Sequence, residues 1–221
     1  MKDTSIIQEY MICSVNEKGK ISGFSTEKMV CLVAAGILEL RLEECISIDS
    51  KRVDVIRPLP ADRQYLKPLY DFIDEKKPVK INKIVEAYNM AFTDKRFRAL
   101  MESVGSSLAG LGLAEERKSG LTGNKNSYIP TAEAIRSVVE MMRAELLEDG
   151  EVTEETAVLV ILLEKGKCLK PYFSKFEQKE MRKKIREIID SPNGKLVKDM
   201  VEHIESLLAI LSSSAASSAS V

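Results

Sequence analysis

Few side chains in this sequence could carry out catalysis. The single histidine, His203, stands between apolar Val201 and Ile204 and has no cysteine or histidine near it in the chain. Nucleophilic triads and most zinc hydrolases need at least one well-placed histidine, so neither chemistry is indicated. The cysteines form no C-x-x-C pair and are predicted to be reduced core residues of a cytosolic protein: Cys13, Cys31, Cys45 and Cys168. We expect no enzyme activity, no metal and no cofactor.

Basic side chains are the other group with chemical potential, and they gather between residues 95 and 125. This stretch has a local charge of +3 from Lys95, Arg96, Arg98, Arg117, Lys118 and Lys125, less three glutamates. Each Lys or Arg near an anionic bilayer adds about 1 kcal/mol of attraction, so the stretch could be a salt-sensitive membrane contact or an ordinary solvated surface. A second basic run, Arg182–Arg186, is interleaved with glutamates at helical spacing and is predicted to be a solvated, ion-paired face.

The overall composition is that of one folded soluble domain. The chain has 221 residues, 44% apolar and 30% charged, enough for one hydrophobic core and too few for several domains. A net charge of -1 gives no argument from total charge to nucleic acid or membrane. The longest apolar stretches, Val30–Leu38 and Ala157–Leu163, are far shorter than the roughly 20 residues of a membrane span. No secretory signal is visible at the amino terminus, so we expect a cytoplasmic protein.

Hydrophobic periodicity predicts an all-α, mainly helical domain. Helices are expected at about 26–42, 62–75, 81–92, 94–111, 131–147, 153–163, 174–190 and 195–211. The helices at 26–42 and 153–163 are apolar on nearly all sides, so they should lie at the centre, ringed by amphipathic helices. We expect residues 1–211 to form the single domain and the Ser/Ala-rich residues 212–221 to be a disordered tail.

Short β elements are predicted at one or two places. The alternating runs Cys45–Ile48 and Val53–Ile56 predict a β-hairpin. The polar, glycine-rich stretch 117–128 predicts an exposed loop, in which a second small hairpin can form. Pro68 is expected early in its helix or at a kink.

One segment is specific enough to suggest a family. Residues Val33–Asp49 read VAAGILELRLEECISID, a buried helix that ends in Leu-Glu-Leu-x-Leu and leads into a short strand. This pattern resembles the Golgi phosphoprotein 3 family. Tyr10–Lys20 looks like that family's opening strand and turn, and Leu108–Leu113 is similar to the helix end before its hydrophobic hairpin. The resemblance covers about residues 10–211 and implies a mostly helical domain. The short leader before it suggests a prokaryotic relative.

The resemblance also implies where a lipid headgroup would bind. Eukaryotic members bind phosphatidylinositol 4-phosphate on Golgi membranes through a tryptophan, an arginine of the buried helix, and two arginines three residues apart. These positions fall on Phe24, Val33, Arg98 and Met101, with Lys95 and Arg96 nearby as substitutes. The candidate headgroup residues are therefore Phe24, Lys95, Arg96 and Arg98. The family's hydrophobic hairpin corresponds here to the polar residues 120–127.

The expected function is that of a peripheral membrane-associated binding or adaptor protein, on the cytosolic membrane face. It would bind anionic phospholipid weakly through the basic patch, and the resemblance adds the cytosolic tails of membrane proteins as partners. One alternative is a winged-helix DNA-binding protein, with the helix at 94–111 in the major groove and the basic loop on phosphates. The near-neutral total charge argues against it. A lipid-independent protein-interaction scaffold is the third alternative.

Overall fold

The computed structural model describes residues 4–22, 25–49, 51–89, 95–119, 125–148, 151–191, 195, 197–202, 204–206 and 209. Its elements in chain order are α1 (Ile6–Ser14), α2 (Thr26–Leu42), β1 (Ile46–Asp49), β2 (Arg52–Val55), η1 (Ala61–Leu66), α3 (Lys67–Lys76), β3 (Val79–Lys80), α4 (Ile81–Asn89), α5 (Lys95–Gly110), β4 (Ala114–Ser119), β5 (Lys125–Pro130), α6 (Ala132–Leu146), α7 (Glu154–Lys165) and α8 (Lys175–Ile189). Residues 197–202 and 204–206 are also helical. The predicted mainly helical fold is confirmed. The expected tail at 212–221 lies outside the described residues.

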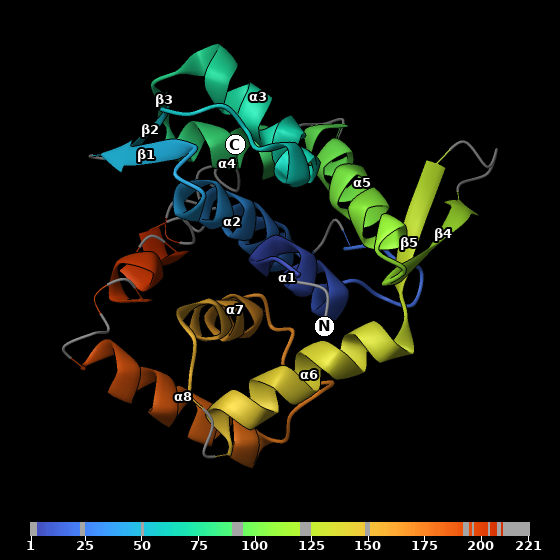
Figure 1. Cartoon of the computed structure of the whole chain (residues 1–221), viewed down its shortest axis with the longest axis vertical. Helices are drawn as coiled ribbons and strands as arrows, with labels where there is room; N and C mark the ends of the chain where they lie inside the picture. The colour runs from blue at the N-terminus through green and yellow to red at the C-terminus, as the bar shows by residue number, and fades with distance from the viewer. Residues whose placement is uncertain are drawn as a thin grey trace, which may run out of the picture.

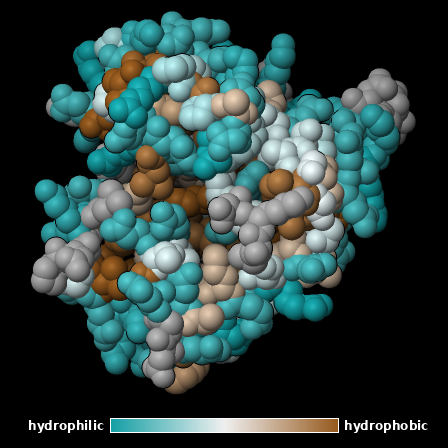
Figure 2. Space-filling model, in the orientation of Figure 1, coloured by the Kyte–Doolittle hydropathy of each residue, from teal (hydrophilic) through white to brown (hydrophobic). Residues whose placement is uncertain are grey.

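Three helices that are apolar on almost every side form the centre. Helices α1, α2 and α7 contact one another, and the other helices lie around them (Figure 1). In α2 every residue from Met29 to Leu40 is buried, and in α7 every residue from Thr156 to Leu163 is buried. Most of the face in Figure 2 is hydrophilic, with hydrophobic residues gathered in a hollow near its middle. The predicted central pair is therefore confirmed, and α1 joins it.

The prediction that Tyr10 and its neighbours form an opening strand is wrong. Residues Ile6–Ser14 form helix α1, all nine of them buried. Ser5 ends the extended backbone before the helix, and its N–H donates to Gln8 Oε1 at 3.0 Å. A short, uninterrupted apolar run is equally compatible with a buried strand and a buried helix, so its periodicity could not decide. The turn after it, around Asn16, is present as predicted.

Both predicted hairpins are present, and one small strand was not predicted. Strands β1 and β2 pair antiparallel with Ile48 opposite Val53, and β3 adds to β2 with Val79 opposite Val53. A strand as short as β3 shows no alternation that the sequence could reveal. Strands β4 and β5 pair from Ala114–Pro130 to Ser119–Lys125, so much of the polar stretch forms a hairpin beside α5.

Three helices begin at the predicted positions, each after a residue whose side chain caps the helix. The side chain of Thr131 accepts from Ala134 N–H at 3.1 Å, and Thr153 accepts from Thr156 N–H at 3.2 Å. Ser174 and Glu177 form a capping box at the start of α8. Pro68 occupies the first turn of α3, where a missing N–H costs no helical hydrogen bond. The single helix predicted at 62–75 is divided in the structure into the 3₁₀ turn η1 and helix α3.

Candidate anion-binding site

A cavity of about 290 Å³ lies between α5, β5 and the loop that follows α1. Its lining comes from α5, β5, the loop after α1, and Met11 within α1. The lining residues are Met11, Gly19, Lys20, Ile21, Phe97, Arg98, Met101, Glu102, Lys125, Asn126, Ser127 and Tyr128. Buried Met11, Phe97 and Tyr128 supply an apolar interior. The charged side chains are exposed and stand around this interior. The cavity thus joins an apolar floor to a charged rim.

The loop that carries Lys20 is fixed by Asn16. The Asn16 side-chain oxygen accepts from Lys18 N–H at 2.9 Å and from Lys20 N–H at 3.1 Å. The Asn16 N–H donates to the Lys20 carbonyl at 3.0 Å, and the Asn16 carbonyl accepts from Gly19 N–H at 2.8 Å. These four hydrogen bonds close the loop and hold Lys20 at the mouth of the cavity.

Two glycines allow the three segments to approach so closely. Gly19 has a φ of +65°, and a Cβ there would overlap the backbone of Tyr128. Gly105, in the middle of α5, faces the Tyr128 ring, which a Cβ would also overlap. At position 19 only glycine adopts the observed φ without strain, and at positions 19 and 105 only glycine leaves room for Tyr128. Tyr128 is therefore held between the loop and α5.

The charges around the cavity favour an anion. Lys20, Arg98 and Lys125 supply three cations, and Glu102 supplies one carboxylate. Arginine offers a planar fork of N–H donors that matches phosphate oxygens, and lysine acts as a compact point charge. The cations come from the loop, α5 and β5, so a phosphate group at the mouth would meet donors from several directions.

The structure brings together only part of the predicted headgroup set. Arg98 lines the cavity, and Met101 lines it too, at the position of the family's second arginine. Val33 is buried in α2 and does not line the cavity. Phe24 lies outside the described residues. Arg98 and Met101 thus line one cavity, while Val33, the corresponding position on the buried helix, carries no charge.

The two proposed substitutes do not join Arg98. The Arg96 guanidinium lies over the Phe72 ring at 5.2 Å and lines a different hollow, between α3, β3, α4 and α5. Lys95 is exposed and lines neither cavity. Lys20, which is far away in sequence and lies outside the predicted basic patch, takes their place. Its signal was the Asn-x-x-Gly turn before it.

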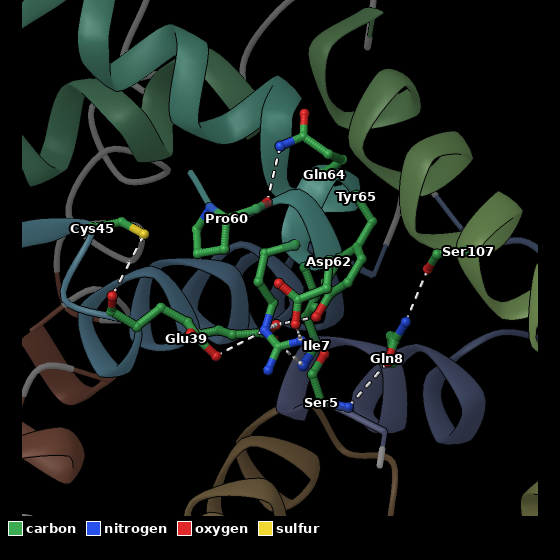
Figure 3. Close-up of polar contacts among 12 residues, drawn as sticks. Ser5, Ile7, Gln8, Glu39, Cys45, Pro60, Asp62, Gln64, Tyr65 and Ser107 are labelled. Atoms are coloured by element: carbon green, nitrogen blue, oxygen red, sulfur yellow. Dashed lines mark hydrogen bonds and ion pairs between the residues drawn. The ribbon is translucent and has the colours of Figure 1, made fainter. Parts of the chain in front are cut away.

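A second group of ionisable side chains is buried beneath the start of α1 (Figure 3). The Glu39 carboxylate accepts from Ile7 N–H at 3.2 Å and from the Tyr65 hydroxyl at 2.5 Å. Burial raises the pKa of Glu39, although these hydrogen bonds oppose the shift. Glu9 accepts from the Thr4 hydroxyl at 2.7 Å, and burial raises its pKa to about 7. Neither carboxylate was predicted to have a role: Glu39 belongs to the Leu-Glu-Leu segment that suggested the family, and Glu9 stands in an apolar helix without any motif.

These buried carboxylates have structural partners that account for them. Glu39 satisfies a free N–H in the first turn of α1, where a negative charge also favours the helix dipole. Within the described residues, no group of three or more His, Cys, Asp and Glu side chains is arranged to hold a metal ion. The four cysteines are buried and have free thiols, as predicted for core residues. His203 lies outside the described part of the chain.

Comparison with known proteins supplies the family. The family model of Golgi phosphoprotein 3 (GPP34) matches residues 6–204, which is most of the 221-residue chain. No curated protein matches the chain. Among the described helices, none is long and apolar enough to cross a membrane. The match agrees with the segment from Val33 to Asp49 that suggested the family from sequence, and it extends over every element from α1 to α8. The chain belongs to the Golgi phosphoprotein 3 family.

Proposed function

We propose that this protein is a peripheral membrane-associated binding or adaptor protein that holds an anionic phospholipid headgroup in the cavity between α5, β5 and the loop after α1. The observation that carries the proposal is the convergence of Lys20, Arg98 and Lys125, from three segments, around one cavity. Membership of a non-enzymatic binding and adaptor family supports it. In this role the protein would sit on the cytosolic membrane face and could recruit the cytosolic tails of membrane proteins.

The geometry supports phosphate recognition of modest strength. Three cations near an anionic surface contribute about 3 kcal/mol in total, which is a weak and salt-sensitive attraction. Glu102 stands beside them and reduces it. Because Val33 and Met101 carry no charge, a phosphoinositide headgroup would find one arginine fork here and two lysines. The proposed ligand class is therefore an anionic headgroup of phosphoinositide type, bound weakly.

Vesicle sedimentation tests the proposal. Phosphatidylcholine vesicles with and without phosphatidylinositol 4-phosphate would be mixed with the wild-type chain and with a Lys20→Gln/Lys125→Gln variant. We expect binding only with the anionic lipid and a loss of about tenfold or more in the variant, because two cations are removed. The variant Lys179→Gln/Lys183→Gln, which removes two exposed charges from α8, is the matched control. Equal binding by the two variants would overturn the placement of the site.

One observation keeps a second candidate function in view. Helices α4 and α5 followed by the β4–β5 hairpin have the order of a winged helix, in which α5 would enter a DNA groove. The exposed ridge of α5, however, consists of Lys95, Ala99, Glu102 and Ser106. Such a ridge offers few donors to base edges. A gel shift with random duplex DNA at low salt should show no complex, and a shift that Lys95→Gln abolishes would favour DNA instead. Binding in neither assay would favour a scaffold that reads peptide tails.

A further inference from the structure

We propose that a second basic cluster binds the phosphate of another anionic lipid in the same membrane, so that the protein touches the bilayer at two points. The inference rests on the proposed function and goes beyond it, because it assigns a site outside the first cavity. The cluster consists of Lys76, Lys80, Lys83 and Arg96, which surround a hollow of about 630 Å³ between α3, β3, α4 and α5.

The cluster holds more positive charge than its surroundings neutralise. Glu86 is the one carboxylate among the lining residues, and it is already paired with Lys83 at 2.6 Å. Within the described part of the chain, no carboxylate lies within 4.0 Å of the charged groups of Lys76, Lys80 or Arg96. Packing does not require four cations at this place, since all of them are exposed. An anionic ligand would balance them.

An aromatic ring positions two of the cations. Phe72 is 7% exposed, and its ring lies 6.0 Å from Lys76 Nζ and 5.2 Å from the centre of the Arg96 guanidinium. A cation over a ring face is held by the ring's quadrupole, while a guanidinium keeps its N–H donors in its own plane. Phe72 therefore orients donors toward the hollow without consuming their hydrogen bonds.

Helix α5 links this cluster to the first cavity. An α-helix turns by about 100° per residue, so Arg96 and Arg98 point about 160° apart, and Lys95 stands between them on the exposed ridge. The flank with Arg96 faces α3 and α4, and the flank with Arg98 faces β5. Lys95, Arg96 and Arg98 stand in the first turn of α5, where the positive end of the helix dipole repels them. Anions bound on both flanks would reduce this repulsion.

The shape of the cluster favours a phosphate group over an acidic peptide. A phosphate presents several oxygens to donors that converge from different sides, as the four cations do from three helices and a strand. An acidic peptide would instead need a groove with donors in a row. The proposed occupant is therefore a lipid phosphate, and the experiment includes an acidic peptide as the alternative ligand.

The first arm of the test is an NMR titration with sn-glycerol 3-phosphate, which needs no membrane. We expect amide shifts at residues 79–87 and at Arg96, in addition to shifts near Lys20 and Asn126. The variant Lys76→Gln/Lys80→Gln should lose the first group and keep the second, and the Lys179→Gln/Lys183→Gln control should keep both. Shifts near Lys20 alone would overturn the second site and leave the proposed function intact. Shifts at residues 79–87 alone would overturn the first cavity, and shifts at neither would overturn both.

The second arm separates a lipid from a soluble phosphate or a peptide. Lys76→Gln/Lys80→Gln should weaken binding to phosphatidylcholine vesicles containing phosphatidylglycerol by about tenfold relative to the control variant. Vesicle binding equal to the control, with the glycerol phosphate shifts retained in the wild type, would show a site for soluble phosphates and would overturn the membrane source. A decaglutamate peptide that shifts residues 79–87 where glycerol phosphate does not would overturn the proposal in favour of an acidic peptide.

Discussion

The Tyr65 hydroxyl donates a hydrogen bond of 2.5 Å to the buried Glu39 carboxylate, and so joins the turn η1 to the central helix α2. The same carboxylate accepts from Ile7 N–H at the start of α1. Arg63 lies 3.9 Å from it and pairs more closely with Glu43, at 2.7 Å. One side chain thus connects three elements at the centre of the domain, α1, α2 and η1.

Replacing Tyr65 by Phe should lower the free energy of unfolding by about 2 kcal/mol. A hydrogen bond to a charged group is worth roughly 1.5–3 kcal/mol, and the carboxylate loses its closest donor. Urea denaturation of the wild type and the variant measures the change. Tyr70→Phe is the control, since the Tyr70 hydroxyl donates to the Arg57 carbonyl at an exposed position. Equal losses in the two variants would contradict the role given to Glu39.

Glu9 should make the domain less stable as the pH rises. Its pKa in the folded protein is about 7 against an ordinary value of 4.5, first because of burial and then because of Glu145, Glu39 and Glu155 nearby. The Thr4 hydroxyl opposes the shift. Because the folded state binds the proton more tightly, its contribution is complete below about pH 4.5 and is lost as the pH rises through about 7. The difference corresponds to about 3 kcal/mol.

Urea denaturation at pH 5 and pH 8 checks this dependence. The wild type should be less stable at pH 8, and Glu9→Gln should remove most of the difference because an amide does not titrate. Arg63 and Glu9 line one hollow at the start of α1, but Arg63 stays charged at both pH values, so it does not produce the effect. A Glu9→Gln variant with the same pH dependence as the wild type would assign the effect to another group, with Glu39 the next to test.

Gly105 should not tolerate a side chain. A Cβ at this position would overlap the Tyr128 ring, so Gly105→Ala should cost about 1–3 kcal/mol and should also weaken vesicle binding by displacing β5. Gly110→Ala, in the same helix, is the control because nothing lies within 4 Å of a Cβ there. That change should cause no loss of stability, because alanine fits the space and Gly110 is the last residue of α5. A thermal melt and the vesicle assay measure both effects, and tolerance of Gly105→Ala would contradict the packing described.

Vesicle binding should fall steeply with salt. The cations of the first cavity are exposed, and the Debye length shortens from about 10 Å at 0.1 M to about 3 Å at 1 M salt. Sedimentation repeated across this range should show progressive loss of the bound protein. The Lys20→Gln/Lys125→Gln variant should depend less on salt. Binding that is unchanged by salt would point to apolar insertion as the main attraction.

Much of the fold could be predicted because its signals are local. Helices α6, α7 and α8 begin beside Thr131, Thr153 and Ser174, where the sequence predicted their starts, and the alternating residues around Val53 pair as expected. Helix α1 could not be recognised, because Tyr10–Cys13 is an uninterrupted apolar run, which carries no period to distinguish helix from strand. In the structure, α1 packs against α2, α5, α6 and α7, which places it at the centre.

Only part of the candidate site could be predicted from the sequence, because the site depends on contacts between segments that are distant in the chain. Arg98 could be located on its helix, but closeness in sequence does not place Lys95 or Arg96 beside it in the cavity. On a helix, neighbours point to different sides, and Arg96 faces α3 instead of the cavity. Lys20 comes from a loop far from α5 in sequence, and a turn motif alone could not show that it would meet Arg98.

The position of Tyr128 also governs how the cavity can move. Its backbone packs on Gly19 and its ring on Gly105, so neither the loop nor the hairpin can shift far without releasing the other. Local opening should therefore be cooperative: the amides of the loop and of β5 would exchange with solvent at similar rates. A ligand that bridges Lys20 and Lys125 would slow both together. The cavity would then open and close as one unit, because the packing of Tyr128 couples the loop to the hairpin.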